Sequence, residues 1–328
     1  MDLAFTGEEK RKTGPTKKWS EGEIEAELKK FADKLEDDKA NHGEIEQRDT
    51  ILDKADFLRY EVEDFVEAEK VYREAYTMTG GASKKMEILF ECLLMAFEKE
   101  EVPKIGTDIK TCLKLVDDGA DWDKKNKLKI FEGVYCMMIR DFKKASDLFV
   151  NSIATFTATE VMSFRDFVFY TVVLSILTQD RKTIKKEVIH SPDILAVNRD
   201  IPNLKSFGES FYNCDYKTFF REFIEICEQV KSDKYLKDHA HYYTKEMRLV
   251  AYKQYLESFK SVTIDNMANA FGVSGDFIDR ELSTFIYNGK LNCKIDKVSG
   301  VIESNRPNRK AELFGNTIKM GDALLNRV

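Results

Sequence analysis

The sequence predicts an all-α protein in which a solenoid of helical hairpins is followed by one small winged-helix module. The 328 residues include only five prolines and sixteen glycines, with 43% hydrophobic and 34% charged residues. Few helix breakers and a high content of charge favour long helices over sandwiches or barrels. An internal repeat and one change of hydrophobic period near the carboxyl end support the two parts of this prediction.

The internal repeat consists of a helix, a short turn with an acidic residue, and a second helix. Its clearest copies begin at Asp64 and Asp141, where an aromatic residue follows the acid and an alanine lies four positions after it. Weaker copies begin at Glu101, Asp180 and Asp215, so the starts are 35 to 40 residues apart. This interval is typical of helix-pair solenoids, whose units bury their apolar stripes only by stacking on one another. We expect a right-handed, TPR-like solenoid with a surface for binding.

The stretch 261–308 has the pattern of a winged helix. Apolar residues at helical spacing predict one helix over 263–271 and a second from Ser274 to Asn288, where the following glycine supplies a left-handed stop. The period then changes to two, which predicts a β-hairpin. Its first strand contains Leu291, Cys293 and Ile295, its turn spans 296–300, and its second strand contains Val301, Ile302 and Glu303. We expect strand in this wing alone.

The charges of the second helix separate two possible partners of a winged helix, nucleic acid and protein. This helix carries Asp276, Asp279 and Glu281 against a single cation, Arg280, and phosphates would repel it. Weak contact with RNA stays open because the wing and its exit are basic, with Lys290, Lys294, Lys297, Arg306, Arg309 and Lys310. The favoured partner is a protein that pairs with an open strand edge of the wing.

The rest of the chain falls into segments of different character. We expect a flexible tail over 1–18, a charged helix over 19–43, the solenoid over 44–237, a long helix plus the winged helix over 238–308, and a terminal helix over 309–328. The terminal helix has a small apolar face with Ile318, Leu324 and Leu325. Such a face suits a bundle of several chains, and docking on the protein's own wing is the alternative.

The residue types needed for catalysis are not arranged as a site. No segment matches the phosphate loop, dinucleotide, zinc-protease or serine-hydrolase motifs, and His239 and His241 point apart on a helix. We therefore expect no enzyme, cofactor or metal. Six cysteines without a CxxC pair indicate reduced thiols in a cytosolic or nuclear protein. The sequence shows no signal peptide, and its most apolar run, 167–177, is too short to cross a bilayer.

The order of solenoid, long helix, winged helix and terminal helix resembles the PCI architecture of scaffold subunits in the proteasome lid, the COP9 signalosome and translation initiation factor three. Short motifs make the resemblance closer to one family, that of the sixth non-ATPase regulatory subunit of the 26S proteasome. They are Asp121-Trp-Asp123, Tyr135-Cys136, Ile139-Arg-Asp-Phe142, Thr155-Phe-Thr157, Lys245-Glu-Met-Arg248, Ala270-Phe-Gly-Val273, Phe277-Ile-Asp279, Glu281-Leu282, Cys293-Lys-Ile-Asp296, Glu303, Asn305-Arg-Pro307, Gly321-Asp322 and Leu324-Leu-Asn-Arg327.

The resemblance implies a non-catalytic scaffold of the proteasome lid, in the cytoplasm and nucleus. Its partners would be other PCI subunits and the regulatory particle, with no small-molecule substrate, no membrane and no nucleic acid. PCI subunits would join edge to edge at the wing, where we expect the second strand to lie at the edge. The expected interface residues are Leu291, Cys293, Ile295, Val301, Ile302, Glu303, Asn305, Arg306, Leu324 and Leu325.

Two alternatives stay open, the first subunit of the COP9 signalosome and a PCI subunit of translation initiation factor three. This sequence also departs from the family's pattern at both ends. Family members usually have a longer amino-terminal helical region and continue for several residues beyond the position of Val328. The second departure weakens the transfer of the tail's role in a shared helical bundle.

Overall fold

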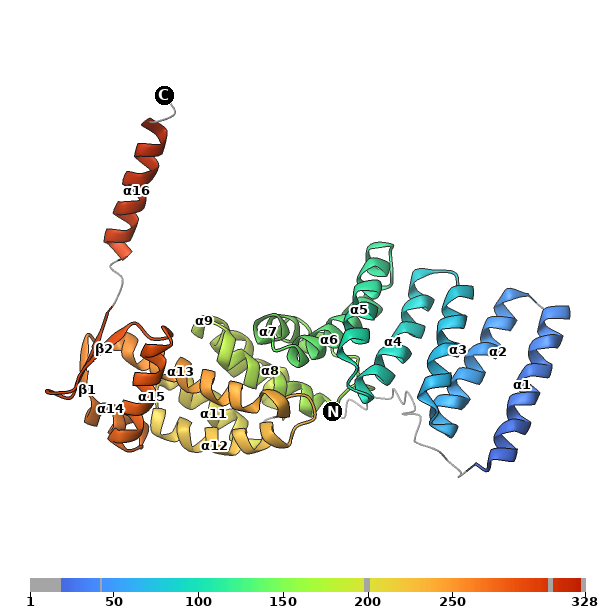
Figure 1. The fold of residues 1–328 in the computed structure, drawn as a ribbon, viewed down its shortest axis with the longest axis horizontal. Helices are drawn as coiled ribbons and strands as arrows, with labels where there is room; N and C mark the ends of the chain where they lie inside the picture. The colour runs from blue at the N-terminus through green and yellow to red at the C-terminus, as the bar shows by residue number, and fades with distance from the viewer. Residues whose placement is uncertain (1–18, 42, 198–200, 306–308, 326–328) are drawn as a thin grey trace. The chain divides into compact units, whose positions relative to one another are not determined.

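A computed structural model describes residues 19–41, 43–197, 201–305 and 309–325, and the chain divides into two compact units (Figure 1). The first unit is Met1–Thr178 and the second is Gln179–Val328. Helices dominate both, which confirms the predicted class. None of the described helices is long and apolar enough to cross a membrane.

The first unit is a stack of helices in which each packs on the next along the chain. The row of α1 to α5 is clear in Figure 1. The predicted charged helix lies along its neighbour, because Trp19 and Phe31 both pack against the ring of Phe57. The elements are α1 (Glu21–Asn41), α2 (Glu44–Phe57), the π-helical turn η1 (Leu58–Val62), α3 (Phe65–Met78), α4 (Ala82–Glu98), α5 (Val102–Asp117), α6 (Trp122–Met138), α7 (Phe142–Val150), the 3-10 turn η2 (Ile153–Thr155) and α8 (Phe164–Thr178).

In four of the five predicted repeats the two helices are joined by the same tight turn. In these four repeats the residue just before the acidic residue has a left-handed backbone conformation, with φ between 56° and 66°. None of these four residues is glycine; they are Glu63, Glu100, Arg140 and Cys214. The next residue is the N-cap of the second helix, and the carboxylates of Asp64, Asp141 and Asp215 accept hydrogen bonds from its first N–H groups. Glu101 and Asp180 are also N-caps. All five predicted repeat starts are thereby confirmed as turns.

Ring contacts between helices of neighbouring repeats, and between successive helices, help to build the core of the first unit. Phe90 of α4 stacks on Phe131 of α6 with ring centroids 5.0 Å apart, and Phe149 of α7 meets Phe167 of α8 at 5.2 Å. Gly133 lets α6 approach α7 closely, since a Cβ there would lie 2.3 Å from the ring of Phe149. Each fully buried aromatic side chain stabilises the stack by roughly 1.5–3 kcal/mol.

The second unit places one further helical hairpin beside the winged helix. Its core contains the buried rings of Phe211, Tyr216, Phe219, Phe220 and Phe223 and extends to Phe271 of the winged helix. The elements are α9 (Arg181–Thr183), η3 (Ile184–Ile189), α10 (Pro192–Val197), α11 (Pro202–Asn213), α12 (Tyr216–Ser232), η4 (Lys237–His239), α13 (Ala240–Ser258), β1 (Ser261–Thr263), α14 (Ile264–Phe271), α15 (Gly275–Tyr287), β2 (Cys293–Asp296), β3 (Val301–Ser304) and α16 (Arg309–Leu325).

The sheet of the winged helix has three antiparallel strands in the order β1-β3-β2, which corrects two expectations. Strand is not confined to the wing, because Ser261–Thr263 pairs with Val301–Glu303 before the first helix begins. The second wing strand is therefore the central strand and not an edge. The wing gains this third strand because the chain that leaves α13 stays extended beside β3, which lets Val262 enter the core. Three residues are too few for a period-two pattern to be recognised.

Candidate assembly surface

Four apolar side chains of the wing strands lie on the face of the sheet that covers the winged helix itself, those of Leu291, Cys293, Ile295 and Ile302. Leu291, Cys293 and Ile302 are buried and Ile295 is half-buried, while the half-buried Val301 lies on the opposite face with Glu303. The face that we expected to meet a neighbouring subunit thus covers the protein's own core. What these strands offer to a partner is backbone and polar side chains.

The backbone of β2 forms an open edge among the described strands. The N–H of Asn305 donates to the carbonyl of Asn292 at 2.9 Å, and opposite residues of an antiparallel pair alternate between bonded and non-bonded positions. Lys294 and Asp296 therefore face β3, whereas the backbone groups of Cys293 and Ile295 face away from it. These outward groups are the donors and acceptors that an added strand would use.

The other edge, β1, is shorter. The N–H of Ser304 donates to the carbonyl of Lys260 at 2.9 Å, and by the same alternation Ser261 and Thr263 face outward. Thr263 already caps α14 through a 3.3 Å hydrogen bond from the N–H of Asn266 to its hydroxyl oxygen. This edge ends where the helix starts.

The solvent face of the sheet is polar. Ser261, Glu303 and Lys294 lie opposite one another in one row across the three strands. A shallow groove of about 520 Å³ lies over this row. Two of the expected interface residues, Glu303 and Asn305, line it, and a third, Arg306, lies outside the described residues.

Two of the three acidic side chains of α15 are held in ion pairs, and the third, Asp276, is exposed. Asp279 pairs with Lys297 of the wing at 3.1 Å, and Glu281 pairs with Arg248 of α13 at 2.7 Å. Glu281 also accepts a 2.9 Å hydrogen bond from Tyr252, whose pKa is raised by burial and by this carboxylate. The sequence shows these acids but not their partners. Counting residues therefore overstated the negative charge of this helix.

The solvent-exposed stripe of α15 is mixed, with Asp276, Phe277, Arg280, Thr284 and Tyr287. Tyr287 is 91% exposed, and Phe277 lies beneath the guanidinium of Arg248. One cation among two aromatic rings provides little of the positive charge that a phosphate backbone requires. This stripe fits contact with protein better than contact with nucleic acid.

The terminal helix α16 is amphipathic, and none of its side chains that the structure describes is buried. Six large apolar residues are at least half exposed, namely Leu313, Phe314, Ile318, Met320, Leu324 and Leu325. Residues three, four and seven apart share one face of a helix, so the six form a single stripe. An apolar stripe of this kind marks a binding surface. Docking on the protein's own wing would bury part of it, which is not observed.

The described residues contain no group of three His, Cys, Asp or Glu side chains placed to hold a metal ion. All six cysteines are free thiols, and five of them are buried. What the second unit presents to its surroundings is an open strand edge, a polar sheet face and an unpaired amphipathic helix.

Two family models match the chain. The model described as 26S proteasome subunit RPN7 matches residues 17–187, and the PCI domain model matches residues 214–306. The chain is 47% identical to the 26S proteasome non-ATPase regulatory subunit 6 homolog of Arabidopsis thaliana, over 93% of this chain and 78% of that protein. This chain belongs to the RPN7 family. The resemblance seen in the short motifs is therefore confirmed.

Two further relatives distinguish the RPN7 family from the alternative family of COP9 signalosome subunit 1. The 26S proteasome non-ATPase regulatory subunit 6 of Dictyostelium discoideum is 44% identical over 93% of this chain and 80% of its own length. COP9 signalosome complex subunit 1 of Neurospora crassa is 27% identical over 62% of this chain and 49% of its own length. Similarity to the RPN7 family is thus both higher and more extensive.

Proposed function

We propose that this chain is a non-catalytic scaffold subunit of the lid in the 26S proteasome regulatory particle. It would support ubiquitin-dependent degradation by joining other PCI subunits, and other chains would carry out the proteolysis and the removal of ubiquitin. The observation that carries the proposal is the membership of the RPN7 family, at 47% identity over 93% of the chain. The open strand edge and the exposed stripe of α16 agree with an assembly role.

We propose two contact regions for this assembly. The first is the β2 edge, where the backbone of Cys293 and Ile295 faces outward, together with Glu303, Asn305 and Arg306 at the end of β3. The second is the apolar stripe of α16 with Leu324 and Leu325. Backbone pairing fixes the direction of a partner strand, and burial of an apolar helix face adds most of the binding free energy.

The proposed organisation follows the segments expected from the sequence. The charged helix at 19–43 closes one end of the repeats, 44–237 forms the solenoid, 238–308 contains the PCI joint, and 309–328 is a separate docking helix. Proposed partners are proteins alone, in cytoplasm and nucleus. A small-molecule substrate, a cofactor, nucleic acid and a membrane have no part in the proposal.

Affinity purification tests the proposal. The full chain is tagged at its own locus, purified from its own cells under mild conditions and examined by native mass spectrometry. We expect it within a complex of proteasome regulatory subunits. Recovery with COP9 signalosome subunits and without proteasome subunits would replace the proposal by the first alternative. Co-sedimentation with ribosomal complexes alone would replace it by the second.

A further inference from the structure

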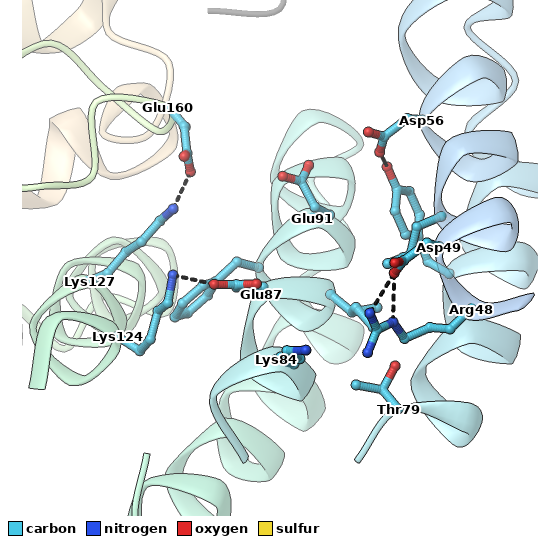
Figure 2. A pocket seen from close by; sticks show the side chains of 14 residues that line it. Arg48, Asp49, Asp56, Thr79, Lys84, Glu87, Glu91, Lys124, Lys127 and Glu160 are labelled. Carbon is cyan, nitrogen blue, oxygen red and sulfur yellow. Dashed lines mark hydrogen bonds and ion pairs between the residues drawn. The ribbon is translucent and has the colours of Figure 1, made fainter. Parts of the chain in front are cut away.

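Two grooves in the described part of the chain differ in how their charges are satisfied. One, of about 450 Å³, lies between α2, α4 and α6, and three of its cations are paired with carboxylates, as the dashed lines in Figure 2 show. The other lies over the solvent face of the sheet. There Lys260, Lys294 and Glu303 form no ion pair with any described residue. This sheet groove thus has two cations against one carboxylate, and the positive charge of Lys294 lies on the open edge strand.

The backbone of β2 determines how closely an added strand would approach Lys294. The side chain of Lys294 is exposed on the solvent face beside that of Glu303, and its backbone groups face β3. On the outer side, Lys294 therefore takes a non-hydrogen-bonded position against an antiparallel strand, where opposite Cα atoms are about 4.5 Å apart. Its pairing with Glu303 is of the wider, hydrogen-bonded kind, at about 5.5 Å. The charge of Lys294 would thus act most strongly on the residue opposite it in the added strand.

Asp296, the other charged residue of β2, already has its donors. Its carboxylate accepts from the hydroxyl of Ser299 at 2.7 Å and from the N–H of Val298 at 2.9 Å, and these hydrogen bonds lower its pKa. The side chain thereby closes the turn of the wing. Among the four residues of β2, Lys294 has the one charge that is without a partner.

Ile295 adds an apolar requirement on the other face of the same strand. It is half-buried at the sheet edge and lies opposite the fully buried Ile302 of β3. An apolar side chain beside it on an added strand would cover the part that is still exposed. β3 already meets the inner side of β2 in this way, with Ile302 opposite Ile295 and Glu303 opposite Lys294. The inner neighbour thus shows the pattern that fits the outer side.

We propose that the β2 edge selects a strand of another protein in which an acidic residue lies opposite Lys294 and an apolar residue lies opposite Ile295. The inference rests on the proposed function, since it takes the β2 edge as a joint between subunits. It adds the chemistry of the strand that occupies this joint. A strand with a cation opposite Lys294 would be rejected, because like charges directly opposite each other on adjacent strands are destabilising.

A second copy of this chain fits the edge less well. When two β2 strands pair antiparallel about Lys294, the two lysines lie opposite each other. When they pair about Ile295, each lysine meets an Asp296 whose carboxylate is held in the turn of its own wing. Both registers leave Lys294 without a free carboxylate, so the partner strand belongs to a different protein.

Competitive incorporation measures the charge preference in the assembled complex. Cells express a wild-type copy and a variant copy of the full chain with different tags, and quantitative mass spectrometry compares their ratio in the purified complex with that in the lysate. Lys294→Glu should be incorporated about fivefold less than wild type, since an attraction between adjacent strands becomes a repulsion. Lys253→Glu, which makes the same charge change at an exposed residue of α13 outside the groove, should be incorporated normally. Equal incorporation of these two variants would overturn the proposal.

Lys294→Glu also creates a like-charge pair with Glu303 inside the sheet, and two further variants separate this effect. Glu303→Lys creates the same internal repulsion but keeps a cation at the edge, so it should be incorporated better than Lys294→Glu. The double variant Lys294→Glu with Glu303→Lys restores the internal pair and should still be incorporated poorly. Normal incorporation of the double variant would assign the effect to the sheet itself and refute a charge-selected partner. Thermal unfolding verifies that all variants are folded.

Zero-length cross-linking with a carbodiimide, which joins an amino group to a carboxylate in contact with it, identifies the partner residue. We expect Lys294 to be linked to an Asp or Glu that is next to an apolar residue in a strand of another subunit. Three results would each contradict the proposal: a link to Glu303 alone, a link to Asp296 of a second copy, or no link from Lys294 in a complex that is otherwise cross-linked.

The proposed function and the charge preference fail in different ways. The proposed function fails when the tagged wild-type chain is not recovered with proteasome regulatory subunits. The charge preference is measured within whichever complex the chain enters, so it fails when that complex takes up Lys294→Glu as readily as the wild type.

Discussion

The guanidinium of Arg73 in α3 donates two parallel hydrogen bonds, of 2.8 and 2.7 Å, to the carboxylate of Asp108 in α5. Asp108 is buried while the side chain of Arg73 is 39% exposed, so this pair links two repeats at the edge of the core. The hydrogen bonds with Asp108 raise the pKa of Arg73. Loss of Arg73 would leave a carboxylate inside the stack with no counter-ion.

Arg73→Ala should therefore destabilise the first unit by about 2–3 kcal/mol, the usual cost of a buried charged group that loses its hydrogen bonds. Urea unfolding followed by circular dichroism measures the change. Lys70→Ala on the same helix is the control, because the pair of Lys70 with Glu67 is exposed at both ends. Equal losses in the two variants would show that the buried pair has no special role.

Gly133 tests how tightly the repeats pack. Gly133→Ala would place a Cβ 2.3 Å from Phe149, which forces the ring or the helix to move. Overpacking of this kind costs typically about 1–3 kcal/mol, measurable as a lower midpoint of thermal unfolding. Gly22→Ala in α1 is the matched control, since its Cβ would meet no atom within 4 Å. A Gly133→Ala protein as stable as the control would mean that α6 and α7 are not in close contact.

Three buried cysteines should make the stability of the protein depend on pH. Burial raises the pKa of Cys136 to about 11 and the pKa values of Cys92 and Cys112 to about 12. Unfolded thiols ionise near pH 8.5. Because the folded pKa values are higher, the stabilising contribution is complete below that pH and is lost as the pH rises above it. The free energy of unfolding should fall from about pH 9 upward.

The same burial makes the thiols unequal in reactivity at pH 8. Cys214 is half-buried, whereas the other five cysteines are buried. A thiol reagent added to the native protein should modify one site quickly, and Cys214→Ser should abolish that fast phase. Rapid modification of several thiols in the wild-type protein would contradict the packing of α4, α5 and α6.

The turns of the repeats could be predicted from the sequence because an acidic N-cap is a local signal. Asp64, Asp141 and Asp215 satisfy the free N–H groups of the helix that they start, whatever the rest of the fold does. The left-handed residues before them were not predictable. Glu63 and Arg140 have no glycine-like signature, although each ends a helix in a left-handed cap where the next N–H, of Asp64 or Asp141, donates back to a carbonyl of that helix.

The candidate site could be located but not resolved in detail. The alternation of apolar and polar residues predicted β2 and β3, but it could not show which face of each strand covers the core. The strand β1 is too short to carry a pattern, so the strand that begins at Val301 was expected at the edge of the sheet, whereas it is the central strand. The charges of Asp279 and Glu281 are likewise neutralised by residues distant in sequence. All three facts depend on tertiary contacts.

The open strand edge gives a further prediction. Ile295→Pro removes an outward-facing donor of β2 and should leave the chain folded while it loses its PCI neighbours. Val301→Pro removes a donor of the central strand and should instead destabilise the winged helix itself. Lys297→Ala at the turn, whose side chain is largely exposed, should change neither property. Affinity purification and thermal unfolding separate these outcomes, and normal assembly of a folded Ile295→Pro protein would remove β2 as the joint.

The terminal helix gives the last prediction. Leu324→Asp with Leu325→Asp should reduce incorporation into the complex by more than about tenfold, because two apolar side chains that would be buried in a bundle contribute roughly 1.5–3 kcal/mol each. The isolated chain should unfold at an unchanged temperature, since no described side chain of α16 is buried. Asn316→Asp with Ala323→Asp adds the same charge on the side of the helix that points away from Leu324 and Leu325, and this variant should assemble normally. If both double variants assemble as the wild type does, α16 is not a docking helix, and the β2 edge is left as the joint.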